Sequence, residues 1–299
     1  MRTRRAFLAL ALAGLASGAA LAQRDIVPDT NISKDPFAWA LFTYDGESDV
    51  NLKGEPGAED ASAWMADADA AISFPVCTNS QIAFLAGGGF RWTRFEFDKI
   101  PGVGNYDVYT ITVPIDVVYS GLKRWTFWAN VTPGLFSDLD GLTSDDYRTQ
   151  AHGMVMFDAL EGLALSLGVS YDRVFGEDQL YPLGGVVWTV TPEWQLRIIL
   201  PQPAVVYAPT RRLAFFAEAR PAGGLWNIRD SLDGEDYDLS LKTWQVGGGM
   251  EFAVVEHVWV HLAGGMDVNR EYEIQRSSRS LLESEADDAW FARAGLVLR

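Results

Sequence analysis

The stretch Tyr109–Ser120 reads YTITVPIDVVYS and alternates apolar and polar residues along its whole length. Its two tyrosines share one face of an extended strand with Ile111, Val113, Ile115 and Val117, opposite Thr110, Thr112, Pro114, Asp116 and Ser120. At about 3.3 Å per residue and a tilt of about 40°, the tyrosines lie roughly 25 Å apart along the normal to a membrane. This is the height of the apolar band between the aromatic girdles of an outer-membrane barrel. The stretch therefore predicts a membrane-spanning strand with its apolar face toward lipid.

The same alternation recurs at intervals along the chain, with apolar faces within 125–135, 163–171, 244–254 and 258–268. Beyond the first 22 residues, no apolar run approaches the roughly 20 residues that a spanning helix needs. A soluble sheet also alternates, with its polar face toward water. The strand length and the girdle spacing favour the barrel.

The connections between these strands fall into two alternating classes. Longer, mostly polar links are expected at 47–61, 99–105, 138–146, 231–236 and 276–287, together with two brief ones near 176–180 and 208–210. Short turns are expected near 77–80, 121–123, 159–162, 191–193, 221–224 and 254–256. This sorting predicts an all-β, antiparallel up-and-down transmembrane barrel of 14 strands, beginning with 37–44. Twelve strands remain the alternative if 37–44 and 211–230 are not strands.

The N-terminus MRTRRAFLALALAGLASGAALAQ has a basic start, an apolar run and an Ala-x-Ala site, which predicts a signal peptide cleaved between Ala22 and Gln23. The expected organisation is a cleaved signal at 1–22, a periplasmic segment at 23–36 and the barrel at 37–299. The run Thr3–Leu8 also resembles a twin-arginine signal, which would carry an already folded protein. The export route, and with it a soluble periplasmic β-protein, stays open.

Composition narrows the possible partners. The formal net charge is −16, and cleavage would remove three arginines and no acid, so nucleic acid would be repelled. The single cysteine, Cys77, excludes an intramolecular disulfide and a cysteine-based metal site. The expected partners are outer-membrane lipid, lipopolysaccharide and the barrel-assembly machinery, although the last residue is Arg299 where many such barrels end on an aromatic. The oligomeric state is left open.

The stretch LYPLGGVVWTVTPEWQLRIILPQPAVVY, residues 180–207, resembles an uncharacterised family of bacterial outer-membrane β-barrels, a domain-of-unknown-function family. The matching features are Leu180-Tyr181-Pro182-Leu183, the Pro192-Glu193-Trp194 turn, and Leu200-Pro201-Gln202-Pro203 followed by Tyr207. The likeness is firmest over about 160–230. It implies a bacterial outer-membrane location and a barrel fold, and no activity, substrate or catalytic residues.

Within this stretch, Trp194, Leu196, Ile198 and Leu200 are predicted to face lipid, with Gln195 and Arg197 toward the lumen. The turn Thr191-Pro192-Glu193 is predicted to be periplasmic. Arg197 decides this interpretation, because on a lipid face near mid-membrane it would cost about 2–4 kcal/mol.

The sequence carries no catalytic motif in a fitting context, so we expect no enzyme activity, no cofactor and no metal site. Its histidines are His152, His257 and His261; the last two lie four apart on a strand, about 13 Å, too far to ligate one metal. The predicted lumen-facing polar residues are Asp116, Arg148, His152, Asp172, Arg197, Glu251, His261, Asp267 and Arg293, with Asp67, Asp69, Glu218, Arg220 and Glu271 among further charges on the same faces. The predicted aromatic girdle is Tyr109, Tyr119, Trp125, Tyr171, Trp194 and Trp244.

Charges inside a barrel suit two functions. A ring of charges in a pore selects ions, which predicts a porin-like channel for small polar solutes that mildly favours cations. The same charges could instead plug a narrow lumen with salt bridges. A structural or surface-interaction barrel, with acidic loops bridged by divalent cations, is therefore the alternative.

Overall fold

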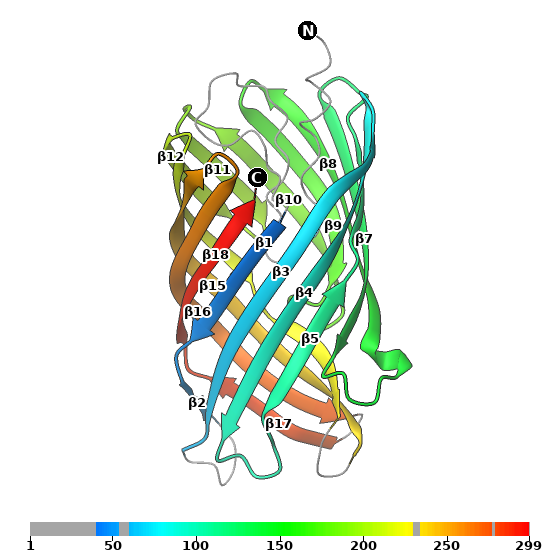
Figure 1. Ribbon diagram of the computed structural model, residues 1–299, viewed down its shortest axis with the longest axis vertical. Helices are drawn as coiled ribbons and strands as arrows, with labels where there is room; N and C mark the ends of the chain where they lie inside the picture. Colours follow the sequence, from blue (N-terminus) through cyan, green and yellow to red (C-terminus); the bar gives the residue numbers. More distant parts are fainter. Residues whose placement is uncertain (1–39, 54–59, 230–233, 277–278, 299) are drawn as a thin grey trace.

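The computed structural model describes residues 40–53, 60–229, 234–276 and 279–298, and nearly all of them lie in β-strands (Figure 1). The predicted signal peptide, with Ala22 and Gln23, and the segment 23–36 lie outside the described residues. Among the described residues, no helix is long and apolar enough to cross a membrane. The strands are β1 Ala40–Glu47, β2 Val50–Lys53, β3 Ser62–Thr78, β4 Ile82–Asp98, β5 Tyr106–Thr112, β6 Ile115–Tyr119, β7 Trp125–Ser137, β8 Tyr147–Leu160, β9 Leu163–Asp172, β10 Gln179–Thr189, β11 Trp194–Leu200, β12 Ala204–Thr210, β13 Leu213–Pro221, β14 Gly224–Arg229, β15 Asp236–Val255, β16 Val258–Arg276, β17 Arg279–Ala286 and β18 Ala289–Leu298, with one 3₁₀ turn, η2 Ser144–Asp146.

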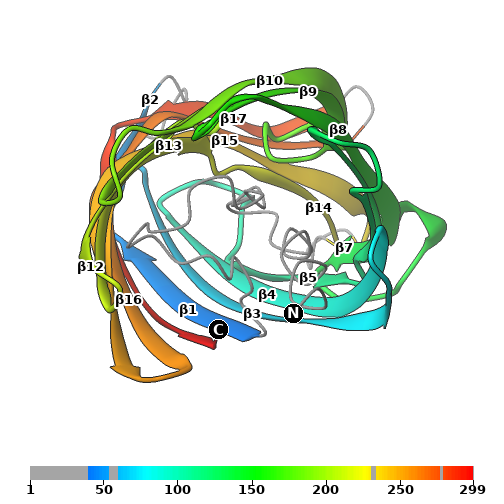
Figure 2. The ribbon, with the colours of Figure 1, turned by 90° about the horizontal axis from the view of Figure 1, so that it is seen from above.

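These segments form one closed sheet. Four strands are each interrupted once, because β1 and β2 both pair with β3, β5 and β6 with β4, β13 and β14 with β15, and β17 and β18 with β16. The last strand closes on the first by antiparallel pairing from Ala40↔Leu298 to Glu47↔Phe291. The result is the predicted 14-strand antiparallel barrel, seen from above as a closed ring in Figure 2.

The predicted connections between 194 and 224 are partly wrong. One turn was missed and one predicted turn does not exist, so the number of strands is unchanged. The segment 194–207 is two strands, because Pro201 and Pro203 lack the N–H that a ladder needs, and β11 ends at Leu200. The next turn, between Thr210 and Leu213, lies on the short-turn side and was predicted on the longer side. The predicted turn at 221–224 is a step inside one strand, from β13 to β14.

The longer links at 47–61 and 276–287 also contain strands. β2 occupies Val50–Lys53, and β17 occupies Arg279–Ala286 and pairs with β16. Both belong to an extension of the barrel beyond its apolar exterior.

The outer surface of the barrel is apolar over the half nearest the short turns. The exposed side chains there include Phe42, Ile72, Phe74, Phe84, Phe90, Ile111, Val113, Ile115, Val131, Leu165, Leu167, Val169, Leu180, Ile198, Leu200, Val246, Val254 and Leu296. An apolar surface that encircles a soluble protein would aggregate, whereas lipid covers such a surface favourably. This half therefore has the exterior of a transmembrane barrel.

The polarity reverses in the half nearest the long loops. On β4, the outward residues change from Phe84 and Phe90 to Arg94 and Glu96, while Phe95 and Phe97 turn inward and are buried. This half has a charged exterior and an apolar interior, as in a water-soluble barrel. We call it the cap.

A β-bulge sets the reversal on β16. Asn269 and Arg270 together oppose the single residue Thr243, and Asn269 has a φ of 54°. The extra residue shifts which side chains face inward, so that Arg270, Tyr272 and Ile274 are buried. Glu271, predicted to face the lumen, instead pairs with Lys242 at 3.3 Å on the half-exposed outer face. That prediction is wrong because strict alternation along the strand hides the bulge.

The cap is narrower than the transmembrane half and is filled by side chains. β14 leaves the line of β13 at Ala222–Gly223 and reaches the opposite wall, where Asn227 bridges Ser137 of β7 and Trp226 Nε1 donates to Thr110 Oγ1 of β5 at 2.9 Å. The enclosed core includes Met65, Phe95, Phe97, Val108, Phe136, Trp226, Ile228, Tyr237, Leu239, Leu241, Tyr272, Ile274 and Leu282. The cap core therefore closes the end of the lumen.

Candidate functional site in the barrel lumen

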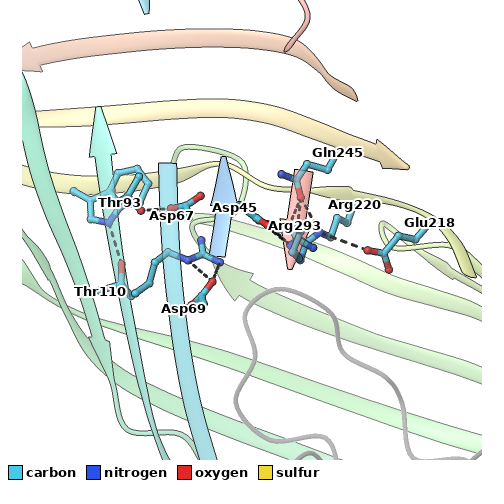
Figure 3. A network of polar contacts seen from close by, with 11 residues as sticks. Asp45, Asp67, Asp69, Thr93, Thr110, Glu218, Arg220, Gln245 and Arg293 are labelled. Carbon is cyan, nitrogen blue, oxygen red and sulfur yellow. Dashed lines mark hydrogen bonds and ion pairs between the residues drawn. The ribbon is translucent and has the colours of Figure 1, made fainter. Parts of the chain in front are cut away.

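The lumen wall in the transmembrane half carries charged side chains that pair with one another (Figure 3). We call this group the ionic cluster; it consists of Asp45, Asp67, Asp69, Arg91, Thr93, Glu218, Arg220, Gln245 and Arg293. Its members come from β1, β3, β4, β13, β15 and β18, which follow one another around the closure of the barrel except that β16 lies between β15 and β18.

Arg293 and Asp45 form a bidentate pair across the first and last strands. Arg293 Nε donates to Asp45 Oδ1 at 2.6 Å, and Nη2 donates to Oδ2 at 2.5 Å. Gln245 Oε1 accepts from both Arg293 at 2.8 Å and Arg220 at 2.7 Å. Arg220 also lies 3.9 Å from Glu218. Planar guanidinium groups suit such paired contacts with carboxylates.

The cluster continues onto β3 and β4. Arg91 Nε and Nη2 both lie 2.9 Å from Asp69 Oδ2, and Thr93 Oγ1 donates to Asp67 Oδ1 at 2.5 Å. Toward the cap, Arg270 pairs with Glu47 at 2.7 Å, and both side chains are almost completely buried beside Asp267. Asp267 lies close to Arg270, although both of its carboxylate oxygens, and Nε and Nη1 of Arg270, make no hydrogen bond with a described residue.

The facing wall carries a neutral and acidic ladder on β6 to β8. Asp116 Oδ1 accepts from Trp128 Nε1 at 2.8 Å and from Asn130 Nδ2 at 2.9 Å. Thr132 then donates to Asn130 Oδ1 at 2.8 Å. Asp116 is buried, and this places it inside the barrel.

His152, Ser170 and Asp172 lie together, but their hydrogen bonds and burial do not suit nucleophilic catalysis. Ser170 Oγ donates to Asp172 Oδ2 at 2.5 Å and lies 2.6 Å from His152 Nδ1. Tyr181 donates to the same Asp172 oxygen at 2.6 Å. Ser170 donates its hydrogen bond to the carboxylate, and its hydroxyl is completely buried, so a substrate has no access to it as a nucleophile.

The remaining predicted lumen residues lie apart from this group. His261 Nδ1 is 3.1 Å from Glu251 Oε1, and the ring stacks on Phe216. Arg197 Nε donates to Gln195 Oε1 at 2.5 Å, and Gln195 is buried. Trp194, Ile198 and Leu200 on alternate positions are exposed, so Arg197 lies on the opposite side of β11 from these apolar residues.

The predicted girdle residues all have exposed or part-exposed side chains. Tyr171, Trp125 and Trp194 are exposed. Trp194 stacks on Tyr207 at 4.6 Å, and Trp125 lies 4.7 Å from Phe157. The other members, Tyr109, Tyr119 and Trp244, are part-exposed and contact Phe90, Phe127 and Phe175 respectively.

The lumen is roofed beside the cap by residues 173–178, which we call the roof loop. Arg173 forms two hydrogen bonds with Asp178, at 2.7 and 3.1 Å, and donates to the carbonyl of Leu225 on β14 at 2.8 Å. Arg148, predicted to face the lumen, lies 3.7 Å from the same carboxylate at the rim. The hydrogen bonds from Arg173 hold the pKa of Asp178 below its ordinary value. Sequence reasoning missed Arg173, because it follows a strand and no periodicity marks it.

A cavity of about 60 Å³ lies under this roof. The wall contributes Asp69, Arg91, Thr110, Thr112, Phe136 and Gln150, and the roof contributes Arg173, Val174 and residues 223–226. Gln150 is 5% exposed, and its amide makes no hydrogen bond with a described residue. Its even position on β8, shared with the predicted Arg148 and His152, already places it on the polar face of the strand in the sequence.

Several solved outer-membrane proteins are similar to this chain at low sequence identity. The match with the Pseudomonas putida toluene transporter TodX covers 96% of each chain at 10% identity with a TM-score of 0.44. An outer membrane channel from Pseudomonas putida F1 covers 87% of this chain and 93% of its own at 7% identity and a TM-score of 0.45. Outer membrane phospholipase A from Escherichia coli covers 86% and 96% at 7% identity and a TM-score of 0.35.

No curated protein matches the chain. A family model described as Domain of unknown function (DUF6268) matches residues 108–297, which is more than half of the sequence. This confirms the resemblance to a domain-of-unknown-function family, and the chain belongs to that family.

Proposed function

We propose that the protein is a channel of the Gram-negative outer membrane for small polar solutes. The observation that carries this proposal is the inverted polarity of the transmembrane half, with an apolar exterior and charged residues on the lumen wall. Water and solutes need such a wall to cross the hydrocarbon layer. The predicted signal peptide would direct export, after which the barrel-assembly machinery would insert the chain among lipid and lipopolysaccharide.

The orientation follows from the unequal ends of the barrel. The short turns lie toward the periplasm, and the charged cap lies on the outside of the cell, as in barrels with short periplasmic turns and larger external segments. The cap core blocks a straight axial path. Solutes leave instead beside the cap, where the roof loop covers the cavity next to β14. The channel is therefore closed while Arg173 holds the roof loop on Leu225.

The charges of the lumen favour cations weakly. The ionic cluster contains four carboxylates, Asp45, Asp67, Asp69 and Glu218, against the three guanidinium groups of Arg91, Arg220 and Arg293. A small excess of negative charge on a pore wall raises the local concentration of cations.

Liposome swelling tests the proposal. Vesicles that contain the folded, heat-modifiable barrel are diluted into isosmotic solutions of neutral polyols and sugars of increasing size. We expect the smallest solutes to enter and entry to slow with solute size. Vesicles with heat-denatured protein provide the control. A folded barrel that admits none of the solutes would overturn the proposed function.

A further inference from the structure

The cavity under the roof loop has the construction of a binding site. One side is the barrel wall from β3 to β8, and the other is formed by Val174 and the first residues of β14. The wall and the roof come from parts of the chain that meet only in the closed barrel. A volume of about 60 Å³ exceeds what one water needs, which is about 10–15 Å³ on the same measure.

The charges that border this cavity are already paired. Arg91 is bound to Asp69, and Arg173 is bound to Asp178 and to the carbonyl of Leu225. A charged ligand would have to break one of these pairs or remain uncompensated in a site with little access to water, which is costly. The cavity therefore suits a neutral ligand.

Gln150 supplies the hydrogen-bonding group. Its amide has two donors and one acceptor, it is buried against the cavity, and no described residue uses it. The amide is not among the fully buried polar atoms without a partner, so it is open to the cavity, where a ligand or water can bond with it. Its neighbour on the wall, Thr132, is engaged with Asn130, so the unsatisfied group is specific to this position.

Apart from Thr110 and Thr112, the rest of the lining is largely apolar. Phe136 and Trp226 both line the cavity, and the indole N–H of Trp226 donates to Thr110. These rings offer only their carbon surfaces to a ligand. A fitting molecule has a few non-hydrogen atoms, a donor and an acceptor at one end, and an apolar edge at the other.

We propose that the cavity beneath the roof loop binds small neutral amides or diols through the side-chain amide of Gln150. This deepens the proposed function, because it names the class of solute that the channel holds before the roof loop opens. A ligand with so few atoms binds weakly, with a dissociation constant on the order of millimolar.

Saturation-transfer NMR on the purified barrel in detergent tests binding without transport. We expect acetamide to give a signal with the native protein, acetate and methylammonium to bind at least about tenfold more weakly, and butyramide to lose the signal because of its size. Gln150→Leu keeps the side-chain volume and removes the amide, and should weaken acetamide binding about tenfold. Thr149→Leu, at the exposed neighbouring position of β8, is the matched control and should bind as the native protein does.

The outcomes separate this inference from the channel itself. Equal acetamide binding by the native protein and by folded Gln150→Leu, or stronger binding of acetate, would overturn the inference. If Gln150→Leu does not fold, the size and charge series on the native protein still decides the matter. Acetamide flux into vesicles without specific binding would overturn the binding site and support the channel. Binding without any flux would support the binding site and overturn the channel.

Discussion

Among single residues, the charged side chains of the lumen stabilise one another by forming ion pairs across strands. Arg293 is placed inward by the alternation of β18, which the sequence reveals. Its partner Asp45 comes from the other end of the chain, and only the closure of β18 on β1 brings the two together. A sequence therefore shows which side of a strand a charge occupies, but not which opposite charge it meets.

Replacing one partner of the Arg293–Asp45 pair should lower the stability of the barrel more than replacing both. Arg293→Met leaves Asp45 buried without its cation, and we expect a loss of about 3–5 kcal/mol in the free energy of unfolding. The double variant Asp45→Leu/Arg293→Met should recover most of that loss, because no unpaired charge remains. Urea unfolding of the barrel in lipid vesicles measures both. Equal losses in the single and double variants would show that the ion pair is not what is being measured.

The roof loop should respond to acid in one direction. Arg173 holds the pKa of Asp178 below its ordinary value of about 3.9, so the pair contributes its full stability above that pH. The contribution is lost as pH falls through the lowered pKa of the folded state. We expect solute flux to stay constant between about pH 5 and 8 and to rise below about pH 4. Arg173→Met should already be open at neutral pH and lose this rise; an unchanged acid response in that variant would refute the role of the pair.

At the scale of elements, the strands were predictable where their alternation is regular. The apolar exterior of 109–119 and 163–171 appears in the structure as the sequence indicates. The region 194–230 was not predictable in the same way. Leu200-Pro201-Gln202-Pro203 is apolar enough to be taken for strand, and β14 is a short segment that is offset from β13 while it still pairs with β15. The apolar residues of β14 pack in the cap core, where they contact strands that are distant in the sequence.

Gly176 seats the roof loop on β15. It has a φ of +79°, and a Cβ there would lie 2.7 Å from Ser240 Oγ and 2.9 Å from the carbonyl oxygen of Leu241. We expect Gly176→Val to lift the loop and to increase flux about tenfold or more. Gly102→Val is the control, since Gly102 has a similar φ of +81° but nothing within 4 Å of the added carbon. Similar flux changes in both variants would attribute the effect to backbone strain instead of the roof.

At the scale of the whole molecule, the protein is one barrel with two polarities. The transmembrane half is apolar outside and charged inside, whereas the cap is charged outside and apolar inside. The sequence predicted the first half, because its strands alternate over the length that a membrane requires. The cap was missed, because its bulge and its narrowing depend on pairing between strands.

A new charge on the outer surface should destabilise the transmembrane half but not the cap. Leu167→Arg places a cation in the apolar band and should cost about 2–4 kcal/mol near mid-membrane. Asp98→Arg changes an exposed side chain at the cap end of β4, opposite Ser62, where a charge stays in contact with water and its reversal should not destabilise the barrel. Folding yields into lipid vesicles, read by heat modifiability on gels, compare the two. Equal tolerance of both changes would argue against a lipid-facing band.

Single-channel recording of the native protein and Arg173→Met, with Arg94→Met as a control on the outer face of the cap, tests the channel most directly. Arg94 pairs with Glu96 at 2.7 Å away from the roof loop, so its loss should leave the channel unchanged. We predict discrete current steps of the same size in all three proteins, a weak preference for cations, and an open probability that is about tenfold higher in Arg173→Met alone. Folded, heat-modifiable barrels that remain silent in all three proteins would contradict the account.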